Sequence, residues 1–264
     1  MSFDPRKQEQ LVEPYSKLAY IYDDVMYHVD YKAWSRYIHR IIQKWHPHAQ
    51  KILDISCGTG SLLLKLNLKN YKLYGCDFSF DMVKIAKMKI KAKKAAIPLW
   101  QGDMIYFGIK PKKVDVIVSL YDSVNYIMNK SGWQKMFDCV YHGLNNDGLF
   151  IFDICTEKNS RKYFHNYFEK KIGKGYYYTR ESNYDSINKI HSNRFVIHFN
   201  SENATFLELH EQRILLLKEV TNLIKHTNFR LLGVYHGFTF KSATENSLRV
   251  HFVLKKKKED DSII

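Results

Sequence analysis

The 264-residue sequence predicts an α/β fold built on a mostly parallel sheet, with an antiparallel β insertion late in the chain. Two observations predict it. From residue 51 to residue 155, short apolar runs alternate with segments of helical periodicity, which is typical of βαβ units with right-handed crossovers. From residue 176 to residue 215, strand-like runs follow one another without an intervening helix, so we expect antiparallel hairpins there.

The N-terminal segment is expected to be helical. Residues 15–45 carry apolar side chains at helical spacing, of which Leu18 and Val25 are examples, and Pro47 ends the second of two expected helices. We therefore interpret residues 1–47 as a helical lead-in that serves as a lid.

Five strands, with helices between them, make up the next part of the chain. The strands are expected at 51–55, 71–77, 98–101, 114–119 and 149–154, and the helices at 61–67, 79–94 and 131–144. The run at 114–119 is almost entirely apolar, as expected for a strand that is buried on both faces. An aromatic-rich helix that includes Tyr163 and Phe168 is expected to follow.

The remaining strands and one helix complete the expected domain division. Strands are expected at 176–184, 189–199 and 205–215, then a helix at 218–227, then strands at 229–238 and 248–254. We assign residues 48–172 and 216–256 to the core domain, 173–215 to the antiparallel insertion, and 257–264 to a charged tail.

Composition and charge limit the classes of protein. The formal net charge of +14 indicates an anionic partner such as RNA, or a bias of genome composition, because the lysines are spread along the whole chain. No apolar run approaches the roughly 20 residues of a membrane-spanning helix, and the first residues lack the apolar core of a signal peptide. The four cysteines form no C-x-x-C pair, so we expect neither a disulfide framework nor a metal site, and we expect the protein in the cytoplasm.

The segment Ile52-Leu-Asp-Ile-Ser-Cys-Gly-Thr-Gly60 carries the strongest chemical signal. A strand leads into an acidic residue and then a tight glycine turn, where the backbone can turn sharply and a ligand can approach closely. A phosphate-binding P-loop would need a lysine after Gly60, and the dinucleotide fingerprint would need a third glycine where Leu63 stands. The turn therefore indicates a different ligand.

Acidic side chains stand at the ends of three successive expected strands. Asp54 suits an amino group or a bound water, and Asp77 can accept both hydroxyls of an unphosphorylated ribose. Asp103 can accept a hydrogen bond from an adenine amino group, with Met104 and Phe78 against the ring. Ligands of parallel sheets bind outside the carboxyl ends of the strands, so these residues predict a cleft for adenosine.

In order and in spacing, these segments resemble the motifs of the class I methyltransferase superfamily. The resemblance is carried by Leu53–Gly60, Gly75–Ser79, Gln101–Met104 and Val114–Tyr126. It implies a seven-stranded sheet with helices on both faces and the last strand antiparallel, and it implies S-adenosylmethionine as cofactor. One departure is Ser56, because the first motif usually begins with glycine at this position.

A narrower resemblance is to a bacterial group of small methyltransferases that are described only by their domain. It is carried by Tyr15–Asp23, Val29–Trp34 and Asp122–Tyr126. It implies that N-terminal aromatic residues close over the cofactor, whose sulfonium favours an aromatic face. The alternative is that Tyr15 and Trp34 are core aromatics of amphipathic helices. The expected cofactor-binding residues are Tyr15, Trp34, Asp54, Ser56, Gly58, Thr59, Gly60, Asp77, Phe78, Met82, Asp103, Met104 and Leu120.

The expected catalytic residues are Asp122 and Asn125, which follow the fourth strand close to where the methyl group should lie. Asp122 would orient or deprotonate the methyl acceptor, and Asn125 and Tyr126 would add polar contacts. The alternative is that Asp122 only shapes the turn into the next helix. His210 and Arg213, on an expected strand of the insertion, could line a substrate pocket, but we favour the interpretation that they lie on a solvated strand face.

Three hypotheses for the function remain. The leading hypothesis is in-line methyl transfer to a small molecule, because the insertion can enclose a modest pocket and no separate RNA-binding domain is evident. The second is methylation of tRNA or rRNA, which the basic charge favours. The third is a protein that binds S-adenosylmethionine without catalysis.

Overall fold

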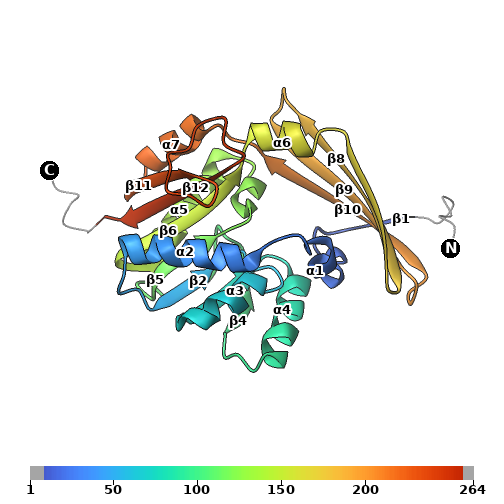
Figure 1. Ribbon diagram of the computed structural model, residues 1–264, viewed down its shortest axis with the longest axis horizontal. Helices are drawn as coiled ribbons and strands as arrows, with labels where there is room; N and C mark the ends of the chain where they lie inside the picture. Colours follow the sequence, from blue (N-terminus) through green and yellow to red (C-terminus); the bar gives the residue numbers. More distant parts are fainter. Residues whose placement is uncertain (1–8, 258–264) are drawn as a thin grey trace.

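Two β-sheets form the framework of the protein (Figure 1), of which a computed structural model describes residues 9–257. The larger sheet has seven strands and confirms the predicted fold class. In sheet order its strands are β11 (Phe229–His236), β12 (Arg249–Lys256), β6 (Leu144–Cys155), β5 (Val114–Ser119), β2 (Lys51–Asp54), β3 (Lys72–Asp77) and β4 (Leu99–Gln101).

The direction of the strands determines where the loops gather. Strands β4, β3, β2, β5 and β6 pair in parallel, whereas β12 is antiparallel to both β6 and β11, so the last strand has the predicted direction. The loops after β2, β3, β4 and β5 therefore leave the same edge of the sheet. This edge carries the residues from which the sequence predicted a cleft.

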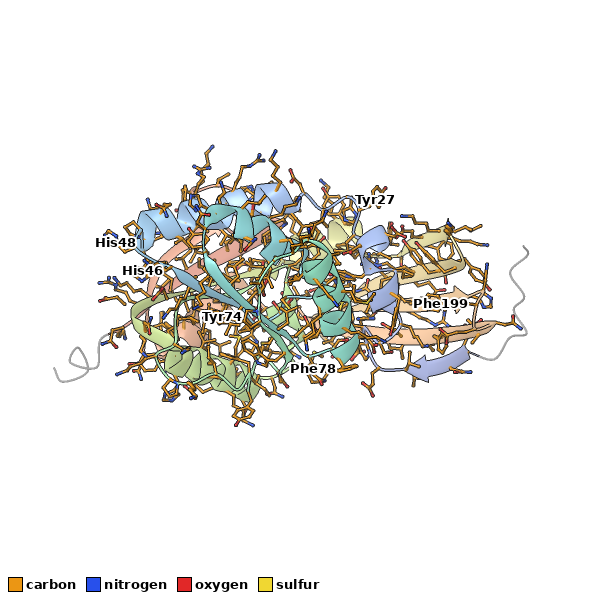
Figure 2. All side chains as sticks on the ribbon, turned by 90° about the horizontal axis from the view of Figure 1, so that it is seen from below. Tyr27, His46, His48, Tyr74, Phe78 and Phe199 are labelled. Atoms are coloured by element: carbon orange, nitrogen blue, oxygen red, sulfur yellow. The ribbon has the colours of Figure 1, made fainter. Side chains whose placement is uncertain are left out.

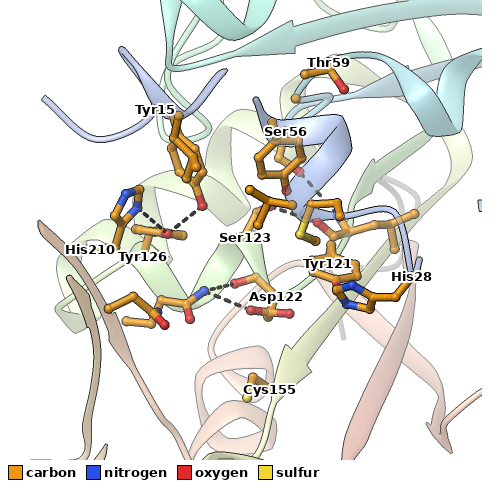
Figure 3. Close-up of a pocket in the computed structure, with 18 of the residues that line it drawn as sticks. Tyr15, His28, Ser56, Thr59, Tyr121, Asp122, Ser123, Tyr126, Cys155 and His210 are labelled. Atoms are coloured by element: carbon orange, nitrogen blue, oxygen red, sulfur yellow. Dashed lines mark hydrogen bonds between the residues drawn. The ribbon is translucent and has the colours of Figure 1, made fainter. Parts of the chain in front are cut away.

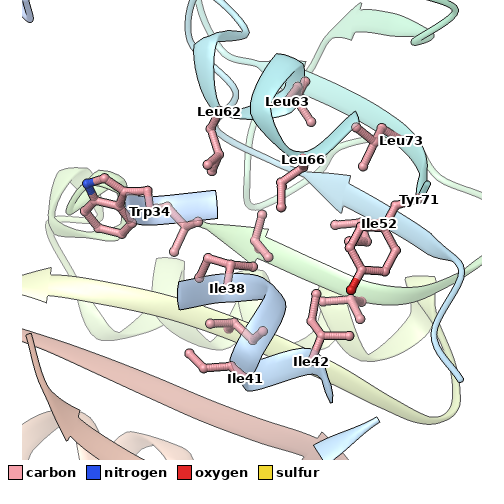
Figure 4. Packing of buried hydrophobic residues seen from close by; sticks show 14 of the residues in the cluster. Trp34, Ile38, Ile41, Ile42, Ile52, Leu62, Leu63, Leu66, Tyr71 and Leu73 are labelled. Atoms are coloured by element: carbon pink, nitrogen blue, oxygen red, sulfur yellow. The ribbon is translucent and has the colours of Figure 1, made fainter. Parts of the chain in front are cut away.

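Helices cover both faces of this sheet. The described helices of the chain are α1 (Tyr22–Val25), α2 (Tyr31–Trp45), α3 (Ser61–Leu66), α4 (Phe80–Ala92), α5 (Lys130–Gly143), α6 (Glu157–Tyr163) and α7 (Leu217–Lys225). Neighbouring residues of β2 face opposite ways, because Ile52 lies in the core cluster with α2 and α3, and Leu53 lies in the cluster with α5 and α7. Figure 4 shows Ile38, Ile41 and Ile42 of α2 packed onto the face of the sheet that carries Ile52.

The second sheet has five strands and stands beside the first (Figure 1). In sheet order its strands are β1 (Glu9–Val12), β10 (Ala204–Arg213), β9 (Ile190–Phe199), β8 (Tyr176–Asp185) and β7 (Tyr167–Gly173). The predicted antiparallel hairpins are confirmed for β8, β9 and β10. The expected helix through Phe168 is wrong, because α6 ends at Tyr163 and the following aromatic segment pairs with β8 as β7.

The N-terminal segment differs in part from the expected lead-in of helices. Residues 9–12 form β1, which pairs in parallel with β10, and only short helical turns precede α2. Residues 15–25 lie between α4 and the second sheet (Figure 2). Leu18 and Val25 pack there against Tyr178 and Phe195 of the second sheet. The segment therefore joins the two sheets.

A carboxylate without exposed surface holds this segment in place. Glu208 of β10 accepts hydrogen bonds from the backbone N–H groups of Tyr15, Lys17 and Leu18, at 2.7, 2.7 and 2.8 Å. The nitrogen Nε2 of His210 lies 3.0 Å from the same carboxylate. Hydrogen bonds to a charged group are stronger than neutral ones, so this clamp fixes the segment over the gap between the sheets.

The sequence also predicted a charged C-terminal tail and no membrane-spanning helix. The expected charged tail at 257–264 lies outside the described residues, except for Lys257. Within the part of the chain that the structure describes, no helix has the length and apolar character that crossing a membrane requires.

Replacing Glu208 tests the clamp. We expect Glu208→Ala to lower the free energy of unfolding by about 3 kcal/mol, because three buried N–H groups lose their acceptor. Urea unfolding measures this loss, and amide exchange of residues 15–25 should become faster. The matched control is Glu211→Ala, an exposed carboxylate on the same strand, which should change little. Equal stability of the two variants would contradict the clamp.

Candidate active site

A cavity of about 590 Å³ lies between the two sheets. Its walls come from the loops after β2 and β5, from the N-terminal segment, and from the inner face of the second sheet. Figure 3 shows Ser56, Asp122, Tyr15 and His210 around it. The volume suits a small organic molecule, and the walls combine aromatic rings with a few polar groups, as in ligand-binding sites generally.

The glycine turn forms one wall of the cavity. Gly58 and Gly60 have φ values of 51° and 76°, in the left-handed region where glycine carries no steric cost. A Cβ on Gly58 would meet nothing within 4 Å, so the backbone faces open space. A Cβ on Gly60 would lie 3.3 Å from that of Ala86, so this glycine allows α3 and α4 to approach. Gly58 thus leaves space for a ligand, and Gly60 allows the two helices to pack closely.

Ser56 fits the turn without strain. Its φ is not among the positive values, and its hydroxyl lies 3.1 Å from that of Ser119 and accepts from the N–H of Leu120. The serine that replaces the usual glycine therefore links the end of β2 to the end of β5.

Two carboxylates flank the turn and are held by backbone N–H groups. Asp54 accepts from the N–H of Ser56 at 3.0 Å, and Asp77 accepts from the N–H groups of Gly58 and Ser79 at 2.8 and 3.0 Å. Burial raises the pKa of Asp54 to about 7 and that of Asp77 to about 6. A cationic or hydroxyl-bearing ligand would stabilise the ionised form of each group.

The loop after β5 has a strained backbone, and contacts with Asp153 and Arg249 hold it in place. Tyr121 and Asp122 have φ values of 62° and 53°, where side chains cost of order 1–3 kcal/mol each. Their N–H groups donate to the buried carboxylate of Asp153, and Arg249 forms ion pairs with both Asp122 and Asp153. The second oxygen of Asp122 accepts from Gln212 at 2.9 Å. This turn is determined by several contacts, which is typical of functional loops.

A chain of hydrogen bonds crosses the cavity wall. The hydroxyl of Tyr15 lies 2.6 Å from that of Tyr126, which lies 3.1 Å from Nδ1 of His210 (Figure 3). The opposite nitrogen of His210 faces the carboxylate of Glu208. Burial raises the pKa of both tyrosines above the usual value, so they carry their protons at neutral pH. The chain can pass a proton from the cavity to His210 without a tyrosinate at rest.

The structure brings together about half of the expected site residues. Those that line the cavity are Tyr15, Asp54, Ser56, Gly58, Thr59, Leu120 and Asp122. Those outside its lining are Trp34, Gly60, Asp77, Phe78, Met82, Asp103, Met104 and Asn125.

The residues outside the lining have other contacts. Trp34 is buried against Phe238 and His251, and Asn125 joins the backbone of Cys155 and Arg213. Phe78 is exposed at the surface (Figure 2).

Three other expected site residues also make contacts outside the cavity. Met82 is buried on α4, behind the N-cap Ser79, and Asp103 accepts from the N–H of Ile105. Met104 packs against the core on the α5 side.

The interpretation of His210 as a solvated residue is wrong. Its side chain is buried and lines the cavity, together with Gln212 of the same strand. The sequence signal was present, because Glu208, His210 and Gln212 alternate with Leu209 and Glu211, as residues of one strand face do. Because all three residues of this strand face are polar, the pattern did not indicate that the face is buried. The sequence also gave no indication of Arg180 and Arg249 in the cavity.

Comparison with known proteins gives the family. The model of a methyltransferase domain matches residues 52–148. The curated protein "Putative methyltransferase YqeM" of Bacillus subtilis (strain 168) is 27% identical over 246 residues, which cover 92% of this chain and 98% of that protein. The crystal structure of an S-adenosylmethionine-dependent methyltransferase from Clostridium acetobutylicum is 26% identical, with a TM-score of 0.78, over 92% of this chain and 99% of that one.

These matches support a class I S-adenosylmethionine-dependent methyltransferase. The fold alone is also shared with the sugar N-methyltransferase KedS8 from Streptoalloteichus, at 17% identity and a TM-score of 0.73, over 98% of this chain and 96% of that one. The cofactor of the methyltransferase is S-adenosylmethionine. The open space at Gly58 and the two carboxylates beside it fit a cofactor that carries an ammonium group and ribose hydroxyls.

The raised pKa values predict how cofactor affinity depends on pH. Below about 7 the carboxyl of Asp54 is protonated in the free methyltransferase, whereas an ammonium or hydroxyl ligand favours the ionised form. The affinity for S-adenosylmethionine should therefore fall as pH decreases from 7 to 5.5. The decrease should be up to about tenfold per pH unit for each proton that a carboxyl group releases on binding. Calorimetry at pH 6 in two buffers of different ionisation enthalpy should show proton release on binding.

Asp54→Asn serves as the control for this dependence. The variant should bind more weakly at pH 8 and should lose most of the proton release, because the neutral amide does not titrate. Affinity that stays constant between pH 5.5 and 8 in the parent protein would contradict the assignment.

Proposed function

We propose that this methyltransferase transfers a methyl group to a small-molecule acceptor that binds in the cavity between the two sheets. The observation that carries this proposal is the cavity itself, whose walls join the glycine turn to the inner face of the second sheet. A volume of about 590 Å³ suits a small molecule. The fold shared with a sugar N-methyltransferase supports the same class of acceptor.

We assign the cofactor to the edge of the sheet where β2, β3 and β4 end. Asp54 would hold the ammonium group, Asp77 the ribose hydroxyls, and Gly58 would allow close approach of the backbone. Asp103 and Phe78 stand at the next strand ends, where the adenine would lie. When bound, S-adenosylmethionine supplies an already activated methyl group.

The side chains of the cavity wall would then place and deprotonate the acceptor. Asp122 is fixed by Arg249 and Gln212, so it suits the orientation of an acceptor better than removal of its proton. The hydroxyl of Tyr15 can accept the acceptor's proton while its own proton moves to Tyr126 and that of Tyr126 moves to Nδ1 of His210.

The product of this shift is an imidazolium beside a carboxylate. Nε2 of His210 keeps its proton on Glu208, and the opposite charges stabilise each other in the buried site. Such a path is needed only for an acceptor that starts protonated, such as a hydroxyl or an ammonium.

We also place the protein in the cytoplasm. Its four cysteines, Cys57, Cys76, Cys139 and Cys155, are all free thiols, as is usual in a reducing compartment.

A label-transfer screen tests the proposal. The full-length protein would be incubated with methyl-tritiated S-adenosylmethionine and either a deproteinised metabolite extract or purified tRNA and rRNA. We expect label in a molecule of the metabolite extract, and none with Asp77→Ala, because this variant loses the acceptor for the ribose hydroxyls.

Each other outcome favours a different hypothesis. Label that appears only in RNA would replace the small-molecule proposal with RNA methylation. Cofactor binding without label in either fraction would favour a non-catalytic protein.

His210→Gln tests the proton path with the acceptor from that screen. We expect kcat to fall by about 10² or more, because the chain loses its terminal base, while the affinity for S-adenosylmethionine changes by less than about twofold. Tyr126→Phe should behave alike, because it removes the hydroxyl that joins Tyr15 to Nδ1 of His210. The control is His198→Gln, a histidine of the same sheet outside the cavity lining. Unchanged kcat in His210→Gln would exclude the path.

A further inference from the structure

The guanidinium of Arg180 stands in the cavity wall without an ionic partner among the described residues. Arg180 lies on β8, and its Nε–H donates to Ser182 and Asn193, each at 3.0 Å. One N–H of Nη2 donates to the same oxygen of Asn193 at 2.7 Å. A guanidinium carries five N–H donors, so three of them, two on Nη1 and one on Nη2, have no acceptor among the residues that the structure describes.

Aromatic rings surround this cation. Its central carbon lies 5.0 Å from the ring centroid of Phe164, 5.4 Å from that of Phe195 and 5.8 Å from that of Tyr167. The ring faces stabilise the cation by cation–π attraction but neutralise no charge. Arg180 is half-buried and Phe195 is buried, so a charge that enters the cavity interacts with Arg180 more strongly than it would at an open surface.

The carboxylates that line the cavity contact groups other than Arg180. Asp122 forms its ion pair with Arg249, at 2.7 Å, and Asp54 accepts from the N–H of Ser56 at 3.0 Å. Glu169 stands opposite Arg180 in the strand pair and lines the same cavity. Its two carboxylate oxygens accept from the hydroxyls of Tyr178 and Tyr167, at 2.8 and 3.4 Å, and it forms no ion pair with Arg180 in the described structure. Arg180 therefore differs from Arg249, the other arginine of the cavity, which has two carboxylate partners.

We propose that Arg180 binds an anionic group of the methyl acceptor, which is a carboxylate or a phosphate, in a subsite lined by Phe164, Tyr167 and Phe195. The planar fork of a guanidinium matches such a group through two parallel N–H donors, and three donors are available here. The subsite rests on the proposed function, because it identifies the class of small molecule that this methyltransferase accepts: an anion with an apolar body that fits between aromatic rings.

The subsite lies within electrostatic reach of the proton path. The charge of Arg180 is among the influences that act to lower the pKa of Tyr126 and of Tyr121, although burial outweighs it in both. One acceptor can therefore meet Arg180 with its anionic end and the hydroxyls of Tyr15 and Tyr126 with its nucleophile. The anion thus sets the orientation in which the nucleophile is presented.

Binding of four matched probes to the full-length protein tests this subsite without knowledge of the acceptor. The probes share a benzene ring and differ in the group attached: benzoate, phenyl phosphate, benzamide and benzylamine. We expect one or both anions to bind about tenfold or more tightly than benzamide and benzylamine, as measured by calorimetry. The comparison of benzoate with phenyl phosphate distinguishes the two anion classes.

Two variants locate the binding. Arg180→Met should weaken binding of the anions by about tenfold or more, while the affinity for S-adenosylmethionine stays within about twofold and shows that the fold is intact. The matched control is Arg194→Met on β9, since Arg194 pairs with Glu9 and Glu181 outside the cavity lining, and this variant should bind the anions like the parent.

Three results would overturn the subsite. They are anion binding that survives Arg180→Met, binding of benzamide or benzylamine as tight as that of the anions, and no binding of any probe at the highest concentration tested. These results would leave methyl transfer intact. Failure to bind S-adenosylmethionine would overturn the proposed function, and anion binding that depends on Arg180 would then no longer identify a methyl acceptor.

Discussion

The site depends on one buried carboxylate, Glu208, which joins the end of one sheet to the segment that closes over the other. Its hydrogen bonds to residues 15–18 place the ring of Tyr15 against the cavity and orient His210 on the same strand. Burial of a charge is unfavourable unless donors compensate it, and here three N–H groups and one imidazole do so. The cavity is therefore a product of the second sheet and the N-terminal segment together with the loops that leave the Rossmann-like core.

Unfavourable local energies gather around this cavity. The turn at Tyr121 and Asp122 is left-handed at two successive residues, and Asp54, Asp77 and Asp153 are held where burial raises their pKa values to about 7, 6 and 6. Such costs persist in folded proteins when the surrounding structure fixes them, and they concentrate at functional sites. Asp153 and Arg249 fix the turn, and backbone N–H groups fix Asp54 and Asp77.

The sequence predicted the parts of the site that depend on local backbone chemistry. The glycine turn, the acidic strand ends and the order of the parallel strands follow from residues that are neighbours along the chain. Contacts between distant segments could not be predicted in this way. Nothing in the sequence near Glu208 indicates that its partner lies 193 residues away at Tyr15. Lys256, in a run of lysines that resembles a solvated tail, is buried and donates to the carbonyls of Tyr141 and Leu144.

The crystal structure of the complex with S-adenosylhomocysteine is the most direct measurement of the central claim. We expect the ribose hydroxyls on the carboxylate of Asp77, the amino group toward Asp54, and the sulfur facing the cavity beside Tyr15 and Asp122. A ligand that binds away from these carboxylates, or a sulfur that faces away from the space between the two sheets, would contradict this assignment.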